Sequence, residues 1–235
     1  MFFTDKYNWI IGALLFALRY YLIAGMLYFI FYVWKEKKFA HLKINPKKPS
    51  ENQLKSELLY SFTTFFIYGL STYLLIYWFQ NGLTKIYLDI NEYGYFYLFL
   101  SVVLMISVHD TYFYWSHQLM HKVSFLYRFH KIHHRSHNPN PWSAFSFHPI
   151  EAIISLGFVP ILVFLIPLHP WALMAFFTLM TAYNVLIHLG YKINPSFGKN
   201  AIQNTAEKHD LHHRIEKYNF GFYFSIWDRI MNTYK

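Results

Sequence analysis

Residues 152–187 read AIISLGFVPILVFLIPLHPWALMAFFTLMTAYNVLI, a run without a single charged side chain. One straight helix of this run would be about 54 Å long, whereas the hydrocarbon core of a bilayer is about 30 Å thick. Pro167 and Pro170 flank Leu168 and His169 near the middle, where proline favours a tight turn. The run therefore predicts a membrane hairpin of two helices, 152–167 and 170–188, that crosses the bilayer or re-enters it.

Three more apolar segments precede the hairpin. Residues 58–79 carry no charge and are long enough to cross a bilayer, 9–34 are interrupted only by Arg19, and 93–108 form a shorter uncharged run. Only 14% of the 235 residues are charged, whereas a soluble domain carries roughly a quarter. We expect an all-α integral membrane protein with about four to five apolar helices, divided into anchor helices in 1–92 and a second part, 93–235.

The positive charges indicate a topology. If the chain alternates from helix to helix, the loop 35–57, the segment 109–150 and the tail 192–235 share one side, which collects all of the 21 Lys and Arg except Lys6, Arg19 and Lys85. Positive loops favour the cytoplasm. The net charge of +9 therefore indicates how the chain is oriented in the membrane, and does not indicate nucleic-acid binding. We expect a multi-pass protein of a bacterial inner membrane or the endoplasmic reticulum, with a cytoplasmic helical cap.

Eight of the 14 histidines fall in three boxes, all on the predicted cytoplasmic side. On a helix, residues spaced i, i+3 and i+4 share one face, so each box presents its imidazoles in one direction. The first box has the pattern H-x3-H, and the other two have the pattern H-x2-HH. The boxes consist of His117 and His121, of His130, His133 and His134, and of His209, His212 and His213.

The boxes predict a metal centre. The chain has no cysteine, so imidazole nitrogen, which suits Zn, Cu, Fe or Ni, is the main ligand on offer. Eight or nine such nitrogens exceed what one ion needs and would suit two adjacent ions. The alternative is a pH-sensing or proton-relay cluster of histidines.

Four further residues are candidates for completing the site. His188 lies at the cytoplasmic end of the hairpin and is the ninth candidate ligand, although a helix-end histidine could simply bond to Asn184. Ligating histidines usually donate their other N–H to a carboxylate or carbonyl. Asp110, His148 and Asp210 are our candidates for that outer layer, with surface charge or helix capping as the alternative. We expect no catalytic residue beyond the metal ligands.

The ordered boxes and the segments between them resemble the fatty acid hydroxylase / sterol desaturase superfamily. The matching stretches are DTYFYWSHQLMH (110–121), HKIHH (130–134), PWSAF (141–145), HPIE (148–151), HLGY (188–191), HDLHH (209–213), NFG (219–221) and WDR (227–229). The chain departs from the family pattern at Gln118, where Arg is frequent, and at 230–233, where a Gly-Thr is usual. The spacing of the first box is similar to that of the sterol desaturase branch.

The resemblance implies a non-haem di-iron enzyme that uses O2 and external electrons to hydroxylate or desaturate a C–H of a sterol-like or fatty acyl lipid. It implies two Fe, and zinc could replace them in purified protein because zinc binds nitrogen ligands more tightly than ferrous iron. The electrons would come from a separate donor of the cytochrome b5 or ferredoxin kind. The rival readings are a histidine-rich metal transporter, a zinc-dependent membrane hydrolase and an inactive lipid-binding relative.

Overall fold

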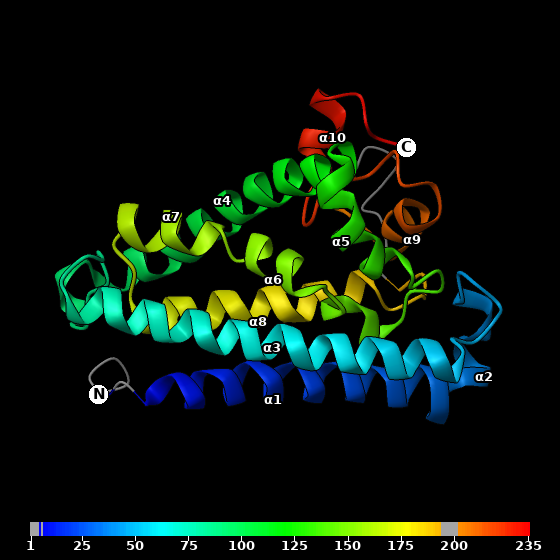
Figure 1. The fold of residues 1–235 in the computed structure, drawn as a ribbon, viewed down its shortest axis with the longest axis horizontal. Helices are drawn as coiled ribbons and strands as arrows, with labels where there is room; N and C mark the ends of the chain where they lie inside the picture. Colours follow the sequence, from blue (N-terminus) through cyan, green and yellow to red (C-terminus); the bar gives the residue numbers. More distant parts are fainter. Residues whose placement is uncertain (1–4, 6, 194–201) are drawn as a thin grey trace.

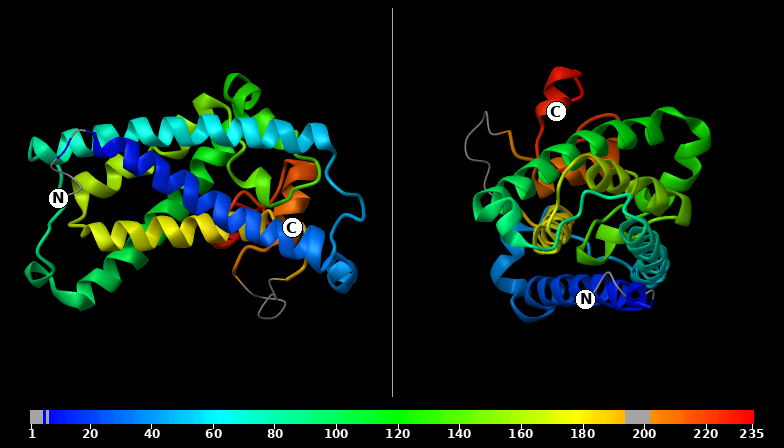
Figure 2. Two further views of the ribbon diagram at one scale, coloured as in Figure 1. Left: turned by 90° about the horizontal axis from the view of Figure 1, so that it is seen from below. Right: turned by 90° about the vertical axis from the view of Figure 1, so that its left-hand side faces the viewer.

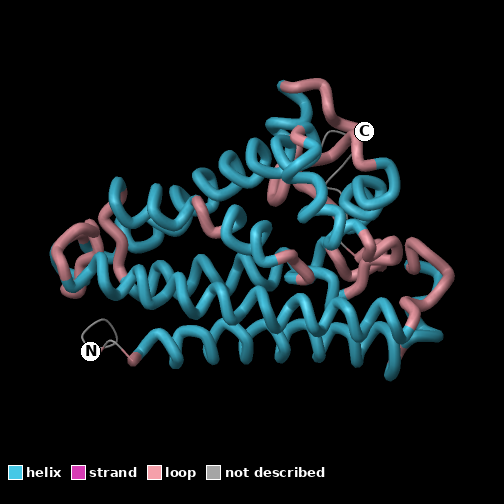
Figure 3. The backbone as a smooth tube through the Cα atoms, viewed as in Figure 1, coloured by secondary structure: helices cyan, strands magenta, loops and turns pink. Residues whose placement is uncertain are grey.

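The computed structural model describes residues 5, 7–193 and 202–235, and within these ranges the regular structure is helical (Figure 3). Three isolated bridges are the β-type pairings among the described residues. Lys6 and residues 194–201 of the predicted tail lie outside the described residues. The all-α prediction is confirmed.

Among the described residues, four helices are long and apolar enough to cross a membrane. They are α1 (Asn8–Tyr28) with its π-helical continuation η2 (Phe29–Trp34), α3 (Glu51–Gln80), α4 (Gly94–Lys122) and α8 (Pro170–Ile187). In Figure 1, α1 and α3 run side by side, α8 lies behind them, and α4 is inclined away. The shorter uncharged run at 93–108 is the first part of α4, which continues through the first histidine box.

Small residues let α1 and α3 approach closely. A Cβ at Gly12 would lie 2.6 Å from Cγ2 of Thr72, and a Cβ at Gly69 would lie 2.5 Å from the Cβ of Ala13. Side chains of this size are common where membrane helices pack, because dispersion contacts between backbones replace a hydrophobic driving force. The two helices thereby form a close pair against which α6, α8 and η5 pack.

The hairpin is confirmed, but its first leg is not one helix. Residues 149–165 form α6 (Pro149–Ser155) and α7 (Phe158–Leu165), which are separated at Leu156 and Gly157. The Tyr112 hydroxyl on α4 donates to the Ile154 carbonyl at 2.7 Å and occupies the space that a side chain at position 157 would need. Pro160 then lies in the first turn of α7, where its missing N–H costs nothing.

The remaining helices gather at the opposite end of the long helices from the hairpin turn. They are α2 (Glu36–Phe39), η3 (Ala40–Leu42), α5 (Ser124–His134), η5 (Pro141–Phe145), α9 (Ala206–Ile215) and α10 (Ile226–Ile230), while η4 (Ile90–Glu92) lies at the hairpin end. Figure 2 shows α9 at the same end of the molecule as the last turns of α8, which it contacts. We call this group the cap. It carries the second and third histidine boxes, whereas the first box lies at the end of α4. That the cap faces the cytoplasm stays a prediction, as does the division of the chain at residue 92.

A buried carboxylate joins the cap to the long helices. Glu57 of α3 is 2% exposed and accepts hydrogen bonds from Ser136, Asn140 and Ser143 at 2.7 to 2.8 Å, as well as from Gln53. A buried carboxylate with all its hydrogen bonds made specifies one arrangement of the chain around it. Glu57 thereby holds the loop that follows the second histidine box against α3.

Candidate metal centre

The first two boxes come from two consecutive helices that meet at a sharp bend. His117 and His121 lie in the last turns of α4, which ends at Lys122. Val123 is extended, with φ −94° and ψ 109°, so α5 starts in a new direction and turns His130, His133 and His134 back toward α4. The i, i+3, i+4 spacing places the three rings on one face of α5, and this is the buried face.

The third box lies on α9, whose start is fixed by Thr205. The Thr205 hydroxyl accepts from the Lys208 N–H at 3.3 Å, a standard N-cap, and the helix ends at Glu216 with a φ of 61°. His209, His212 and His213 are buried. His188 directly follows α8 and is also buried. All nine predicted ligands, each of them described, therefore converge from four helices.

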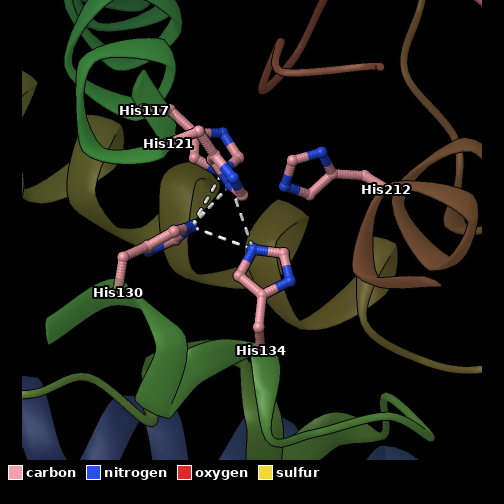
Figure 4. Close-up of side chains that lie close together, drawn as sticks. All are labelled: His117, His121, His130, His134 and His212. Atoms are coloured by element: carbon pink, nitrogen blue, oxygen red, sulfur yellow. Dashed lines mark hydrogen bonds between the residues drawn. The ribbon is translucent and has the colours of Figure 1, made fainter. Parts of the chain in front are cut away.

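The nine rings divide into two groups, each with one nitrogen per ring and all of those nitrogens within 4.8 Å of one another. The five-histidine cluster is drawn from α4, α5 and α9, and Figure 4 shows its rings pointing toward a common centre. The four-histidine cluster is drawn from α5, α8 and α9. The five-histidine cluster contains His117, His121, His130, His134 and His212, and the four-histidine cluster contains His133, His188, His209 and His213.

The outer hydrogen bonds of the five-histidine cluster fix which nitrogen carries the proton. His117 Nδ1 lies 3.0 Å from the Phe220 carbonyl and His212 Nδ1 lies 2.7 Å from the Tyr218 carbonyl. A carbonyl only accepts, so each Nδ1 must be the donor and each Nε2 keeps a bare lone pair. His130 Nδ1 likewise lies 2.7 Å from a Glu151 carboxylate oxygen.

The bare lone pairs of His117 and His130 face each other, with their Nε2 atoms 3.1 Å apart. His130 Nε2 is also 3.0 Å from the Nε2 atoms of both His121 and His134 (Figure 4). Two nitrogens without protons, as in His117 and His130, repel at this distance. A cation at the centre converts that repulsion into ligation, so the residues fit a metal ion.

The ring nitrogens of the four-histidine cluster also lie close to one another. His188 Nδ1 lies 2.8 Å from the Asn184 carbonyl, so its Nε2 has a lone pair, and that atom is 2.9 Å from His209 Nε2 and 3.3 Å from His133 Nε2. His213 Nε2 is 3.2 Å from His209 Nε2. The two readings of His188 are therefore compatible, because one nitrogen bonds to Asn184 while the other joins the cluster.

Burial keeps the rings neutral. Desolvation, with a contribution from the neighbouring imidazoles, lowers the pKa of His209, His212 and His213 well below 6.5 and the pKa of His134 to about 3. Imidazole must be unprotonated to bind a metal ion. The rings are therefore in their ligating form at neutral pH.

The three residues predicted to hydrogen-bond to the ligating histidines have other partners among the described residues. Asp110 accepts from the backbone N–H groups of Tyr223 and Phe224 at 2.7 and 3.2 Å, which holds the segment before α10 against α4. Asp210 pairs with Arg214 at 2.8 Å. His148 caps α6 by accepting from the Ile150 N–H at 3.1 Å. None of these bonds reaches a ring of either cluster.

The carboxylate that does reach a cluster is Glu151, which the sequence analysis did not single out. It lies in the first turn of α6, is 2% exposed, and bonds to His130 as described. The available signal was the quoted HPIE stretch, in which a proline-started helix places an acidic side chain in its first turn. Nothing in that local pattern indicates that the side chain faces His130, 21 residues earlier.

A small, mainly apolar cavity borders both clusters. His117 and His130 of the five-histidine cluster line it, as do His133, His188 and His209 of the four-histidine cluster. Tyr112, Phe113, Met120 and Phe147 supply most of the remaining wall, together with Glu151, Ser155 and other residues. An apolar group in this cavity would therefore lie next to both clusters at once.

Comparison with known proteins agrees with this arrangement. The sequence profile of the fatty acid hydroxylase family matches residues 102–233, which contain all nine histidines and the cavity. The chain belongs to the fatty acid hydroxylase family. No solved structure matches it significantly.

Named relatives of this family member are sterol-modifying proteins. A Delta(7)-sterol 5(6)-desaturase of Schizosaccharomyces pombe is 30% identical over 97% of the chain and 65% of its own length. Lathosterol oxidase of Homo sapiens is 29% identical over 84% of the chain and 66% of its own length. A Delta(7)-sterol 5(6)-desaturase of Gibberella zeae is 31% identical over 79% of the chain. The chain spans 57% to 66% of the length of these relatives.

Proposed function

We propose that this chain is an integral-membrane, non-haem di-iron oxidoreductase that uses O2 and external electrons to hydroxylate or desaturate a C–H of a lipid. The observation that carries the proposal is the pair of clusters of neutral imidazoles that border one apolar cavity. The names of the relatives favour a sterol-like lipid and favour desaturation.

Two iron ions, when bound, would supply the reduction of O2 and the removal of hydrogen from an unactivated C–H. The chain's own residues would hold the ions with the nine imidazoles and position the lipid. Five histidines would hold one ion and four would hold the other. Imidazole also accepts zinc, so the metal found in purified protein would not identify the native one.

The cavity suits a lipid because its wall is apolar and aromatic. Phe113, Met120 and Phe147 would exclude water and hold an alkyl or sterol edge against the histidine rings. The polar groups that remain are the cluster rings and a few side chains such as Ser155. Substrate would enter from the bilayer, since the cavity lies between α4, α6 and α8, and two of these are candidate membrane spans.

Electrons would come from a separate acidic protein of the cytochrome b5 or ferredoxin kind. The helix α5 carries ligands of both clusters on its buried face and exposes Arg128, Lys131 and Arg135 on another face. Complementary charge steers such a partner and speeds its encounter. A donor docked there would be one helix diameter, about 10 Å, from the ions.

We propose the cytoplasm as the location of the cap, in a bacterial inner membrane or in the endoplasmic reticulum. The support is the excess of Lys and Arg in the loops at that end of the helices. A donor that is reduced in the cytoplasm would then reach α5 directly.

Lipid analysis tests the proposed function. Cells that express the chain, together with a competent reductase system and a sterol and fatty acyl panel, are compared with cells that express His130→Ala. In the cells that express the unaltered chain, and only there, we expect a lipid with two fewer hydrogen atoms or one additional oxygen atom. An iron-loaded chain that yields no oxidised lipid from this panel would contradict the proposal.

A further inference from the structure

Glu151 gives the two clusters unequal surroundings. The outer partners of His117, His212 and His188 are neutral backbone carbonyls. The outer partner of His130 is a carboxylate at 2.7 Å. Within 5, 7–193 and 202–235, no other carboxylate lies this close to a cluster nitrogen, since Glu216 is 3.7 Å from His134 Nδ1.

The short bond decides both the tautomer and the donor strength of His130. The Glu151 carboxylate accepts from Nδ1–H, which leaves Nε2 free to ligate at the centre of the five-histidine cluster. A negatively charged acceptor also pushes electron density into the ring and makes the opposite nitrogen a stronger donor. A carbonyl does this far less, because it carries only a partial charge.

The other oxygen of Glu151 has no hydrogen-bond partner in the part of the chain that the structure describes. Its Oε2 is buried without a hydrogen bond, and Glu151 lines the cavity between the clusters. Desolvating a carboxylate on one side in an apolar wall is costly unless a positive charge lies nearby. The centre of the five-histidine cluster, one imidazole ring away, is the place where such a charge would lie.

We propose that Glu151 is a positioning residue that makes the two metal sites unequal. It strengthens the five-histidine site through His130, whereas no described carboxylate does the same for the four-histidine site. The five-histidine site would hold its ion more tightly and would stabilise the higher oxidation state of that ion. This inference rests on the proposed metal centre, but not on the identity of the lipid or on the reaction.

The chain offers a matched control. Glu57 is as buried as Glu151, at 2%, but its four hydrogen-bond donors are Gln53, Ser136, Asn140 and Ser143, none of which is a cluster histidine. Glu57→Gln removes a buried charge from the fold without touching a ligand. Any effect that follows only from losing a buried carboxylate would appear in both variants.

The experiment measures metal ions and not turnover. Wild type, Glu151→Gln, Glu151→Ala and Glu57→Gln are purified in detergent, loaded with Co(II), and followed by elemental analysis and by visible absorption during titration with a chelator. The wild type should release its two ions in two phases. Glu151→Gln keeps an acceptor for His130 Nδ1–H but loses the charge, whereas Glu151→Ala loses both.

We expect the tighter phase to weaken by about 10- to 100-fold in Glu151→Ala, and by less in Glu151→Gln, with the weaker phase unchanged. Glu57→Gln should keep both phases at wild-type affinity. Equal weakening of both phases, or no change in either, would overturn the inference, and thermal unfolding of the isosteric Gln variants shows whether they fold. A wild type that binds no Co(II) would refute the metal centre itself, whereas one that binds two ions but oxidises no lipid refutes only the reaction.

Discussion

At the residue scale, the hydrogen bond on one ring nitrogen determines what the other nitrogen can do. In His117, His188 and His212 the Nδ1–H donates a hydrogen bond to a backbone carbonyl, so three rings from three helices present bare Nε2 lone pairs to the cluster centres. These contacts cannot be exchanged for other arrangements without moving the main chain. The ligating tautomers are therefore built into the fold before any ion binds.

Removing one histidine ring from either cluster should cost the protein the ion of that cluster. His130→Ala opens the five-histidine cluster and His213→Ala opens the four-histidine cluster. We expect each variant to lose about one metal ion per chain by elemental analysis and to abolish lipid oxidation, because ligand loss typically costs more than the 10- to 100-fold of an outer partner.

The exposed His137, just beyond the second box, is the matched control for these substitutions. His137→Ala should keep both ions and full activity. Full activity in His130→Ala or His213→Ala would show that the ligand assignment is wrong.

Acid should destabilise the metal-free protein. The cluster imidazoles have their pKa lowered by burial, that of His134 to about 3, whereas an unfolded histidine has a pKa of about 6.5. The unfolded chain then binds more protons below about pH 6.5, so the stability contribution is complete above this pH and is lost as the pH falls toward 3.

Thermal unfolding in detergent from pH 7.5 to pH 5 measures this effect. We expect the midpoint of the metal-free protein to fall across this range, and we expect the same acidification to release ions from the loaded protein. A midpoint that is independent of pH would mean that the rings are not buried in their neutral form.

At the element scale, the break between α6 and α7 depends on a contact with α4. Tyr112 lines the cavity and donates to the Ile154 carbonyl, and its hydroxyl fills the space next to Gly157. A local sequence signal for one long helix at 152–167 is thereby overruled by a side chain more than 40 residues away. The break allows α6 to turn Glu151 toward His130.

Gly157→Ala should cost about 1 to 3 kcal/mol, because the new methyl group must displace the Tyr112 ring. The loss should nearly vanish in a Tyr112→Ala background, where the space is already empty. Thermal or denaturant unfolding of the two single variants and the double variant gives the coupling energy. Additive losses would show that the glycine has another role.

The exposed Lys and Arg side chains at α5 should affect the rate of reduction only when the electron donor is a protein. Lys131→Glu with Arg135→Glu reverses the charge of that face, and we expect reduction by an acidic donor protein to slow by about tenfold at low ionic strength. Reduction by dithionite, which needs no docking surface, should be unchanged. Lys37→Glu with Lys38→Glu makes the same charge change on α2, and an equal effect there would place the docking surface elsewhere.

At the scale of the whole molecule, four candidate spans place both histidine clusters at one end. The loops at that end carry most of the Lys and Arg, while the hairpin turn and the loop after α3 lie at the other end. The loop after α3 bonds directly to the hairpin, since the Tyr87 N–H donates to the Leu168 carbonyl at 3.1 Å. At the end of the molecule away from the clusters, the loop after α3 and the hairpin turn are therefore held together by direct hydrogen bonds.

Single cysteines test which end faces the cytoplasm, and the cysteine-free sequence makes this simple. Lys47→Cys and Arg128→Cys lie at the cluster end, and Leu83→Cys lies at the hairpin end. In intact cells a membrane-impermeant maleimide should label only the Leu83 variant, and in inverted vesicles only the other two. The reverse pattern would place the metal centre on the outer side.

Much of this molecule follows from local sequence. The uncharged runs predict the long helices because a bilayer requires helices of a certain length, and the spacing of the boxes predicts shared helix faces because the helical repeat is constant. The same residues place the chain in its family. Nine histidines are predicted as ligands, eight from the box spacing and His188 from its place at the end of the hairpin, and the structure brings all nine into two clusters.

What the sequence by itself determined is therefore the long apolar helices, the set of candidate ligands and the kind of chemistry they suit. Only the tertiary structure decided that the rings divide five to four, that α6 ends at Ser155, that Asp110 and Asp210 have partners elsewhere, and that Glu151 contacts His130. The physical reason is one of distance along the chain. Periodicity reports on neighbours within a turn or two of helix, whereas these contacts join helices whose approach depends on the packing of the whole bundle.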